Sequence, residues 1–102
     1  MKKSYSTKEL RKTIMPIAMK YGVERVFLFG SYARGEQAEK SDLDLRIDKG
    51  EINDYIMLSA FNIDLEEALN ETVDVITTGS LDSSFLEKIR SEEVLIYERA
   101  GH

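Results

Sequence analysis

The sequence of 102 residues contains no cysteine and no tryptophan, and it has one proline. Without cysteine, disulfides and thiolate zinc sites are excluded, which fits a reducing compartment. The only histidine is the last residue, His102, where fraying makes a catalytic role unexpected. No apolar run approaches the ~20 residues of a membrane span, and MKKSYSTKEL has no apolar signal-peptide core. We therefore expect a cytoplasmic protein with no membrane partner.

The residues that are present indicate one acidic globular domain. Hydrophobic residues make up 42% of the chain, and the formal net charge is −5. A chain of this length supports one core, so we expect a single domain over residues 1–102. Nucleic-acid binders normally carry a basic face. The acidic balance therefore argues against stable nucleic-acid binding.

Capping signals and apolar periodicity predict the helices. The capping box Ser6-Thr7-Lys8-Glu9 begins a helix that Gly22 closes, with a kink or a restart at Pro16. A second long helix begins at Asn53 or Asp54 and ends near Leu69, where Asn70 can adopt a left-handed cap. A second capping box, over residues 84–87, predicts that Ser84 opens the last helix.

Short apolar runs between these helices predict the strands, at about residues 25–29, 42–48, 72–76 and 94–97. With a short helix expected after the first strand, the order is αβαβαβαβ. This order predicts a small α/β (α+β) domain, in which helices pack against a mixed sheet.

The turn after the first strand has the chemistry of a phosphate cradle. Gly30 and Ser31 break the apolar run, and Ser31 can cap a short helix through Arg34 before Gly35 ends it. Unpaired backbone N–H groups at such a strand-to-helix turn suit phosphate oxygens. Arg34 could contact a phosphate, or it could be a solvated group at the end of the helix; both interpretations remain open.

After ten intervening residues that follow Ser31, the second strand begins with Asp42-Leu43-Asp44. Asp42, Asp44 and Arg46 share one face of this strand, because residues two apart point the same way. Two such carboxylates either face solvent or hold a divalent cation, and oxygen ligands favour magnesium or manganese. Arg46 either pairs with Asp44 or neutralises phosphate charge.

The pattern Gly30-Ser31, ten residues, Asp42-x-Asp44 resembles the signature of the DNA polymerase beta nucleotidyltransferase superfamily. The motif GSYARGE…SDLDL is most similar to that of the minimal nucleotidyltransferases (MNT) within this superfamily, which are often encoded beside HEPN-domain partners. The family also has a third carboxylate on a later strand. Asp74 supplies it, between Val73 and Val75, which would face the core.

The resemblance implies the nucleotidyltransferase fold and a Mg²⁺-dependent enzyme that uses ATP. Two Mg²⁺ ions, with Mn²⁺ as an alternative, would bind the catalytic carboxylates Asp42, Asp44 and Asp74. The nucleotide would bind Gly30, Ser31, Arg34 and Ser41. The reaction implied is transfer of AMP to a tyrosine hydroxyl of a HEPN ribonuclease toxin, with the MNT protein as antitoxin. Oligomerisation is left open.

Two other functions remain open at this point. The chain could be a catalytically silent antitoxin that neutralises its partner by docking. It could also be an aminoglycoside-type transferase that acts on a small molecule, although such enzymes normally build the acceptor pocket with an extra domain or a dimer.

Overall fold

The computed structural model describes residues 5–35 and 42–100. In chain order the elements are α1 Thr7–Tyr21, β1 Arg25–Phe29, α2 Gly30–Ala33, β2 Leu43–Asp48, α3 Tyr55–Leu69, β3 Val73–Thr77, the 3-10 turn η1 Thr78–Ser80, α4 Ser83–Arg90 and β4 Val94–Glu98. The predicted alternation of helices and strands is confirmed.

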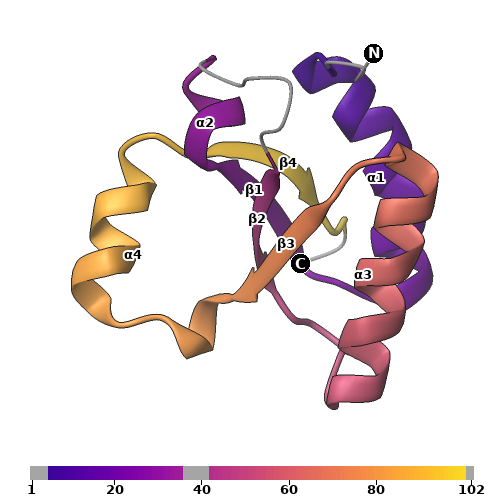
Figure 1. The fold of residues 1–102 in the computed structure, drawn as a ribbon. Coiled ribbons are helices and arrows are strands. Elements are labelled where there is room, and N and C mark those ends of the chain that lie inside the picture. The colour runs from indigo at the N-terminus through magenta and orange to yellow at the C-terminus, as the bar shows by residue number, and fades with distance from the viewer. Residues whose placement is uncertain (1–4, 36–41, 101–102) are drawn as a thin grey trace.

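The four strands form one mixed sheet in the order β3-β2-β1-β4. β1 pairs antiparallel with β2 and β4, whereas β2 and β3 are parallel. The parallel pair needs a crossover, and α3 provides it. Helices α1 and α3 lie together on one side of the sheet, and α4 lies on the other (Figure 1). As a result, the end of β1 and the starts of β2 and β3 meet at one edge of the sheet.

The core lies between the sheet and the pair α1–α3. Every second strand residue points toward these helices, as the strand period requires. The strand residues buried on this side are Val26, Leu28, Leu43, Leu45, Ile47 and Val73. The helix residues that meet them are Leu10, Ile14, Ala18, Phe61, Leu65 and Leu69. Since burying one large apolar side chain contributes ~1.5–3 kcal/mol, this layer supplies most of the stability.

The predicted ends of the two long helices are confirmed. The Ser6 hydroxyl accepts a hydrogen bond from the Glu9 N–H at 3.1 Å, and the Ser6 N–H donates to the Glu9 carboxylate at 3.0 Å. Gly22 closes α1 in the left-handed region, at φ 69°. Asp54 caps the start of α3, and Asn70 ends it at φ 52°. These ends form where local hydrogen bonding and backbone preference agree.

Two predicted capping residues were wrong. Asp82, not Ser84, begins α4, because its carboxylate accepts hydrogen bonds from the Phe85 N–H at 2.8 Å and the Ser84 hydroxyl at 2.9 Å. Ser31 lies inside α2 rather than before it, because β1 runs directly into the helix and Phe29 takes the capping position. The long helix α1 continues through Pro16 without a restart.

The helices are short for a membrane protein. The longest in the described ranges, α1 and α3, have 15 residues each. A membrane span needs ~20 apolar residues. Among the residues that the structure describes, no helix is both long and apolar enough to cross a bilayer.

Candidate active site

The turn between β1 and α2 lies directly against β2. Phe29, the last residue of β1, pairs with Asp44 in the antiparallel register. Gly30 follows with φ +76°, and a Cβ at this position would overlap the Oδ2 atom of Asp44. The backbone conformation therefore favours glycine here, and any other residue would also require the Asp44 carboxylate to move. This contact places the predicted phosphate-binding turn beside one predicted metal ligand.

Two further carboxylates lie near Asp44. The parallel pairing of β2 and β3 makes Asp74 its register partner, and Asp42 directly precedes β2. Burial raises the pKa of the Asp44 carboxyl, the negative charges of Asp74 and Asp42 raise it further, and Arg34 lowers it. All three predicted carboxylates thus share one electrostatic environment. Val73 is buried and Val75 packs against the core, as predicted, whereas Asp74 is exposed.

The carboxylates of Asp42, Asp44 and Asp74 are suitable ligands for magnesium, but they are not spaced closely enough to bind it as they stand. Hard oxygen ligands around a centre of negative charge are what Mg²⁺ prefers, at ~2.0–2.1 Å. Within residues 5–35 and 42–100, however, no three acidic or histidine side chains are grouped closely enough to hold a metal ion as they stand. Binding would therefore require Asp42, Asp44 and Asp74 to draw together.

Arg34 lies at the end of α2, and its side chain contacts the turn between α4 and β4. Its backbone N–H donates to the Gly30 carbonyl at 3.2 Å, which keeps the residue close to the turn. Its Nη1 atom donates to the Glu92 carboxylate at 3.0 Å, in the turn between α4 and β4. The side chain is thus an ion-pair partner rather than a purely solvated group. Ser31 lies in the first turn of α2, and Ser41 is outside the described residues.

Arg46 has a structural role, and its partner is Glu93 rather than Asp44. The guanidinium donates to Glu93 at 2.6 and 3.0 Å and to the Thr78 hydroxyl at 2.7 Å. It also stacks over the Phe27 ring, 4.1 Å from the centroid. Only 3% of the residue is exposed. Arg46 is therefore satisfied inside the fold, where it joins β1, β2, η1 and the turn before β4.

The sequence analysis missed Glu92, Glu93 and Thr78. The two glutamates lie in the acidic stretch Ser91-Glu92-Glu93, which by composition alone is typical of a solvated turn. No spacing in the sequence links them to arginines 58 and 47 residues away. Such long-range pairs become visible only when β4 is placed next to β1.

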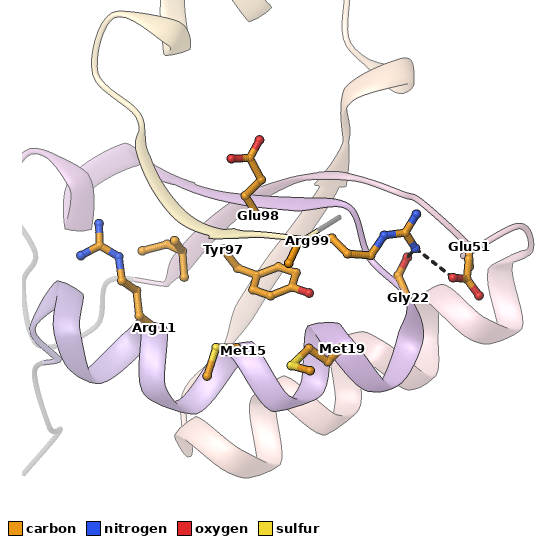
Figure 2. Close-up of a pocket in the computed structure, with 10 residues that line it drawn as sticks. Arg11, Met15, Met19, Gly22, Glu51, Tyr97, Glu98 and Arg99 are labelled. Carbon is orange, nitrogen blue, oxygen red and sulfur yellow. Dashed lines mark hydrogen bonds and ion pairs between the residues drawn. The ribbon is translucent and has the colours of Figure 1, made fainter. Parts of the chain in front are cut away.

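The structure also has a groove away from the acidic residues. It lies between α1 and β4, has a volume of about 630 Å³, and is lined by Met15, Met19 and Tyr97, with Arg11 at one end (Figure 2). An ion pair between Arg99 and Glu51 lies at the other end, at 2.8 Å. None of the predicted site residues lines this groove. The groove is therefore separate from the predicted nucleotide site at the sheet edge near α2.

These features define a class of protein: a small α/β domain with a glycine–serine turn against acidic residues of adjacent strands. The family model described as "Polymerase beta, Nucleotidyltransferase" matches residues 12–102. The chain therefore belongs to this nucleotidyltransferase family, and the resemblance inferred from GSYARGE…SDLDL is confirmed.

Two similar proteins carry adenylyltransferase names. A Methanocaldococcus jannaschii protein named as a candidate protein adenylyltransferase is 41% identical over 86 residues, which are 84% of this chain and 92% of the relative. Protein adenylyltransferase MntA of Thermococcus cleftensis is 34% identical over 89 residues, 87% of this chain and 83% of the relative. The matches therefore span most of both chains.

One solved structure with the same fold contains a partner protein. It is described as a tri-AMPylated Shewanella oneidensis HEPN toxin in complex with an MNT antitoxin. The matched chain superposes with a TM-score of 0.70 at 17% sequence identity, over 92% of this chain and 74% of the other. At this identity the likeness establishes the fold.

Proposed function

We propose that this chain is a protein adenylyltransferase that moves AMP from ATP to a hydroxyl group of a partner protein. The observation that carries the proposal is the register of β2 with β3, which sets Asp44 beside Asp74 and against the Gly30 turn. The adenylyl group is supported by the names of the two relatives, each more than four-fifths covered by this chain.

In the proposed reaction, the backbone N–H groups of Gly30 and Ser31 bind the outer phosphates of ATP. Asp42, Asp44 and Asp74 would hold Mg²⁺, which when bound neutralises charge on the reacting phosphate. Asp74 is exposed and accepts the proton of the acceptor hydroxyl. The acceptor oxygen then forms a bond to the α-phosphorus, the bond to the β-phosphate oxygen breaks, and pyrophosphate leaves.

The acceptor is proposed to be a tyrosine of a HEPN-domain ribonuclease toxin, for which this chain would be the antitoxin. The proposal is supported by the MNT-type motif GSYARGE…SDLDL and by the fold shared with an MNT antitoxin whose structure was solved in complex with an AMPylated HEPN toxin.

The test is incubation of the purified chain with Mg²⁺, α-labelled ATP and a HEPN-domain partner from the same genome. We expect label on the partner, lost on Asp44→Asn and on Asp74→Asn. Glu67→Gln removes an exposed carboxylate on α3, outside the site, and should leave labelling intact. Labelling that survives Asp74→Asn would contradict the assigned role of Asp74.

A second candidate is an antitoxin that acts by docking alone. It is favoured by one observation, that the described carboxylates are not already grouped to hold a metal ion. The double variant Asp42→Asn/Asp44→Asn separates the two functions. Retained binding with lost neutralisation would support catalysis, and retained neutralisation would support docking.

A further inference from the structure

The turn between α4 and β4 carries two adjacent glutamates that bind two different arginines. Glu93 holds Arg46 in a buried pair, with side chains 10% and 4% exposed. Glu92 holds Arg34 at the rim of the site, where the side chains are 27% and 41% exposed. One glutamate therefore belongs to the interior of the fold, whereas its neighbour contacts a group that solvent and substrate can reach.

The position of Arg34 gives its pair with Glu92 a function. Arg34 is four residues after Gly30, and its backbone N–H donates to the Gly30 carbonyl at 3.2 Å. Its charge acts on Asp44, which lies against the same turn. A guanidinium presents its donors in a rigid fork, so its orientation decides whether these donors meet phosphate oxygens. The Glu92 contact at 3.0 Å restricts the orientation of the guanidinium.

We propose that Glu92 is a positioning residue for nucleotide binding, because it holds the Arg34 side chain toward the outer phosphates of ATP. The inference rests on the proposed function, since it assumes that the Gly30 turn binds a nucleoside triphosphate. It assigns a role in substrate binding to a residue 58 positions from the turn helix, in a different part of the fold.

The direction of the effect separates this role from simple electrostatics. Glu92→Gln removes a negative charge near a site for an anion, so charge alone predicts tighter nucleotide binding. Loss of positioning predicts the opposite, because Arg34 would have to be ordered at the moment of binding. Ordering one long side chain weakens binding by about threefold to tenfold. We therefore expect Glu92→Gln to weaken nucleotide binding.

The experiment is calorimetric titration of the full chain with Mg²⁺ and the ATP analogue AMP-PNP, in the absence of any acceptor protein, so that binding is measured without transfer. Glu92→Gln should raise the dissociation constant several-fold, and Glu92→Asp should recover part of the loss. Arg34→Gln should weaken binding at least as much, and adding Glu92→Gln to it should change nothing further. Glu87→Gln, which removes an exposed charge on α4, is the matched control and should bind as the unmodified chain does.

Equal or tighter binding by Glu92→Gln would overturn the inference, and so would a further loss in the Arg34→Gln background. If the unmodified chain does not bind the analogue, the inference and the nucleotide site fall together. If it binds, and the Glu92 variants behave as expected, but no partner is labelled, the positioning role stands and only the proposed acceptor fails. Thermal unfolding should be unchanged by Glu92→Gln, because the pair is partly exposed.

Discussion

The two faces of the sheet differ in chemistry although they are built from alternate residues of the same strands. On β2, Leu45 and Ile47 are fully buried against the helices α1 and α3. Between and beside them, Asp44, Arg46 and Asp48 point to the other face. One face is thus a continuous apolar layer, whereas the other carries ionised groups. The comparison indicates that the helix-covered face stabilises the domain and leaves the opposite face available for chemistry.

The charged face itself has two parts with opposite electrostatics. Asp48, at the end of β2, is paired with cationic and hydroxyl groups. Although burial raises the pKa of Asp48, hydrogen bonds from Thr78 and Arg25 and the charge of Arg46 lower it overall. At the other end of the same strand, the pKa of Asp44 is raised by burial and by neighbouring carboxylates. The pKa values of Asp44 and Asp48 are thus shifted in opposite directions on one strand, which favours the predicted division between a reactive Asp44 and a structural Asp48.

The strongest test of this division is Asp44→Asn. We expect adenylyl transfer to fall by ~10³-fold or more, which corresponds to about 4 kcal/mol of transition-state stabilisation. The raised pKa means that the folded state disfavours the ionised carboxylate, and this penalty grows as pH rises through the folded-state value. In metal-free buffer at pH 7 the variant should therefore unfold at an equal or higher denaturant concentration. If Asp44→Asn lowered the free energy of unfolding as well as the activity, Asp44 would have a structural role, which would contradict the division between structural and reactive charges.

Phe61→Ala tests the apolar face. Phe61 is fully buried, with its ring 5.6 Å from that of Tyr21 in an edge-on contact. The cavity left behind should lower the free energy of unfolding by ~4 kcal/mol. Ile63→Ala, on the same helix but 53% exposed, should change it by less than ~0.5 kcal/mol. Urea unfolding followed by circular dichroism measures both free energies. Similar decreases for the two variants would mean that Phe61 does not lie in the core.

Arg46→Met tests the buried ion pair on the charged face. It leaves Glu93 without its cation in a place that water hardly reaches, so stability should fall by ~3 kcal/mol. The double variant Arg46→Met/Glu93→Leu should recover most of this loss, because no unpaired charge remains. Binding of AMP-PNP by the double variant should be close to that of the unmodified chain. A large loss of binding would show that Arg46 contacts nucleotide.

The smallest expected effect concerns pH and Asp48. Since its pKa is lowered on folding, Asp48 contributes stability that is present above its unfolded value, ~3.9, and lost as pH falls through the folded-state value. Asp48→Asn should therefore weaken the dependence of unfolding on pH below ~4. Thr78→Val removes one of the lowering hydrogen bonds and should act in the same direction. An unchanged acid profile in both variants would mean that Asp48 is not paired in solution.

Local signals predicted the fold because they do not depend on distant residues. The capping box at Ser6, the left-handed positions at Gly22 and Asn70 and the first strand at residues 25–29 all appear as expected. The failures at Ser31 and Ser84 were also local, since a neighbouring residue took the capping position. The pattern Gly30-Ser31, ten residues, Asp42-x-Asp44, with Asp74 on a later strand, indicated the family, but the function of these residues as ligands stays a prediction.

The alternation of apolar and charged residues along β2 by itself determined that this strand has one face for packing and one that carries charge, because side chains of a strand alternate in direction. Tertiary structure alone decided which charges are neutralised. The parallel pairing of β2 with β3 sets Asp74 beside Asp44, and the return of β4 beside β1 brings Glu92 and Glu93 to their arginines. These contacts join residues far apart in the chain, so they depend on strand order, which no local pattern encodes.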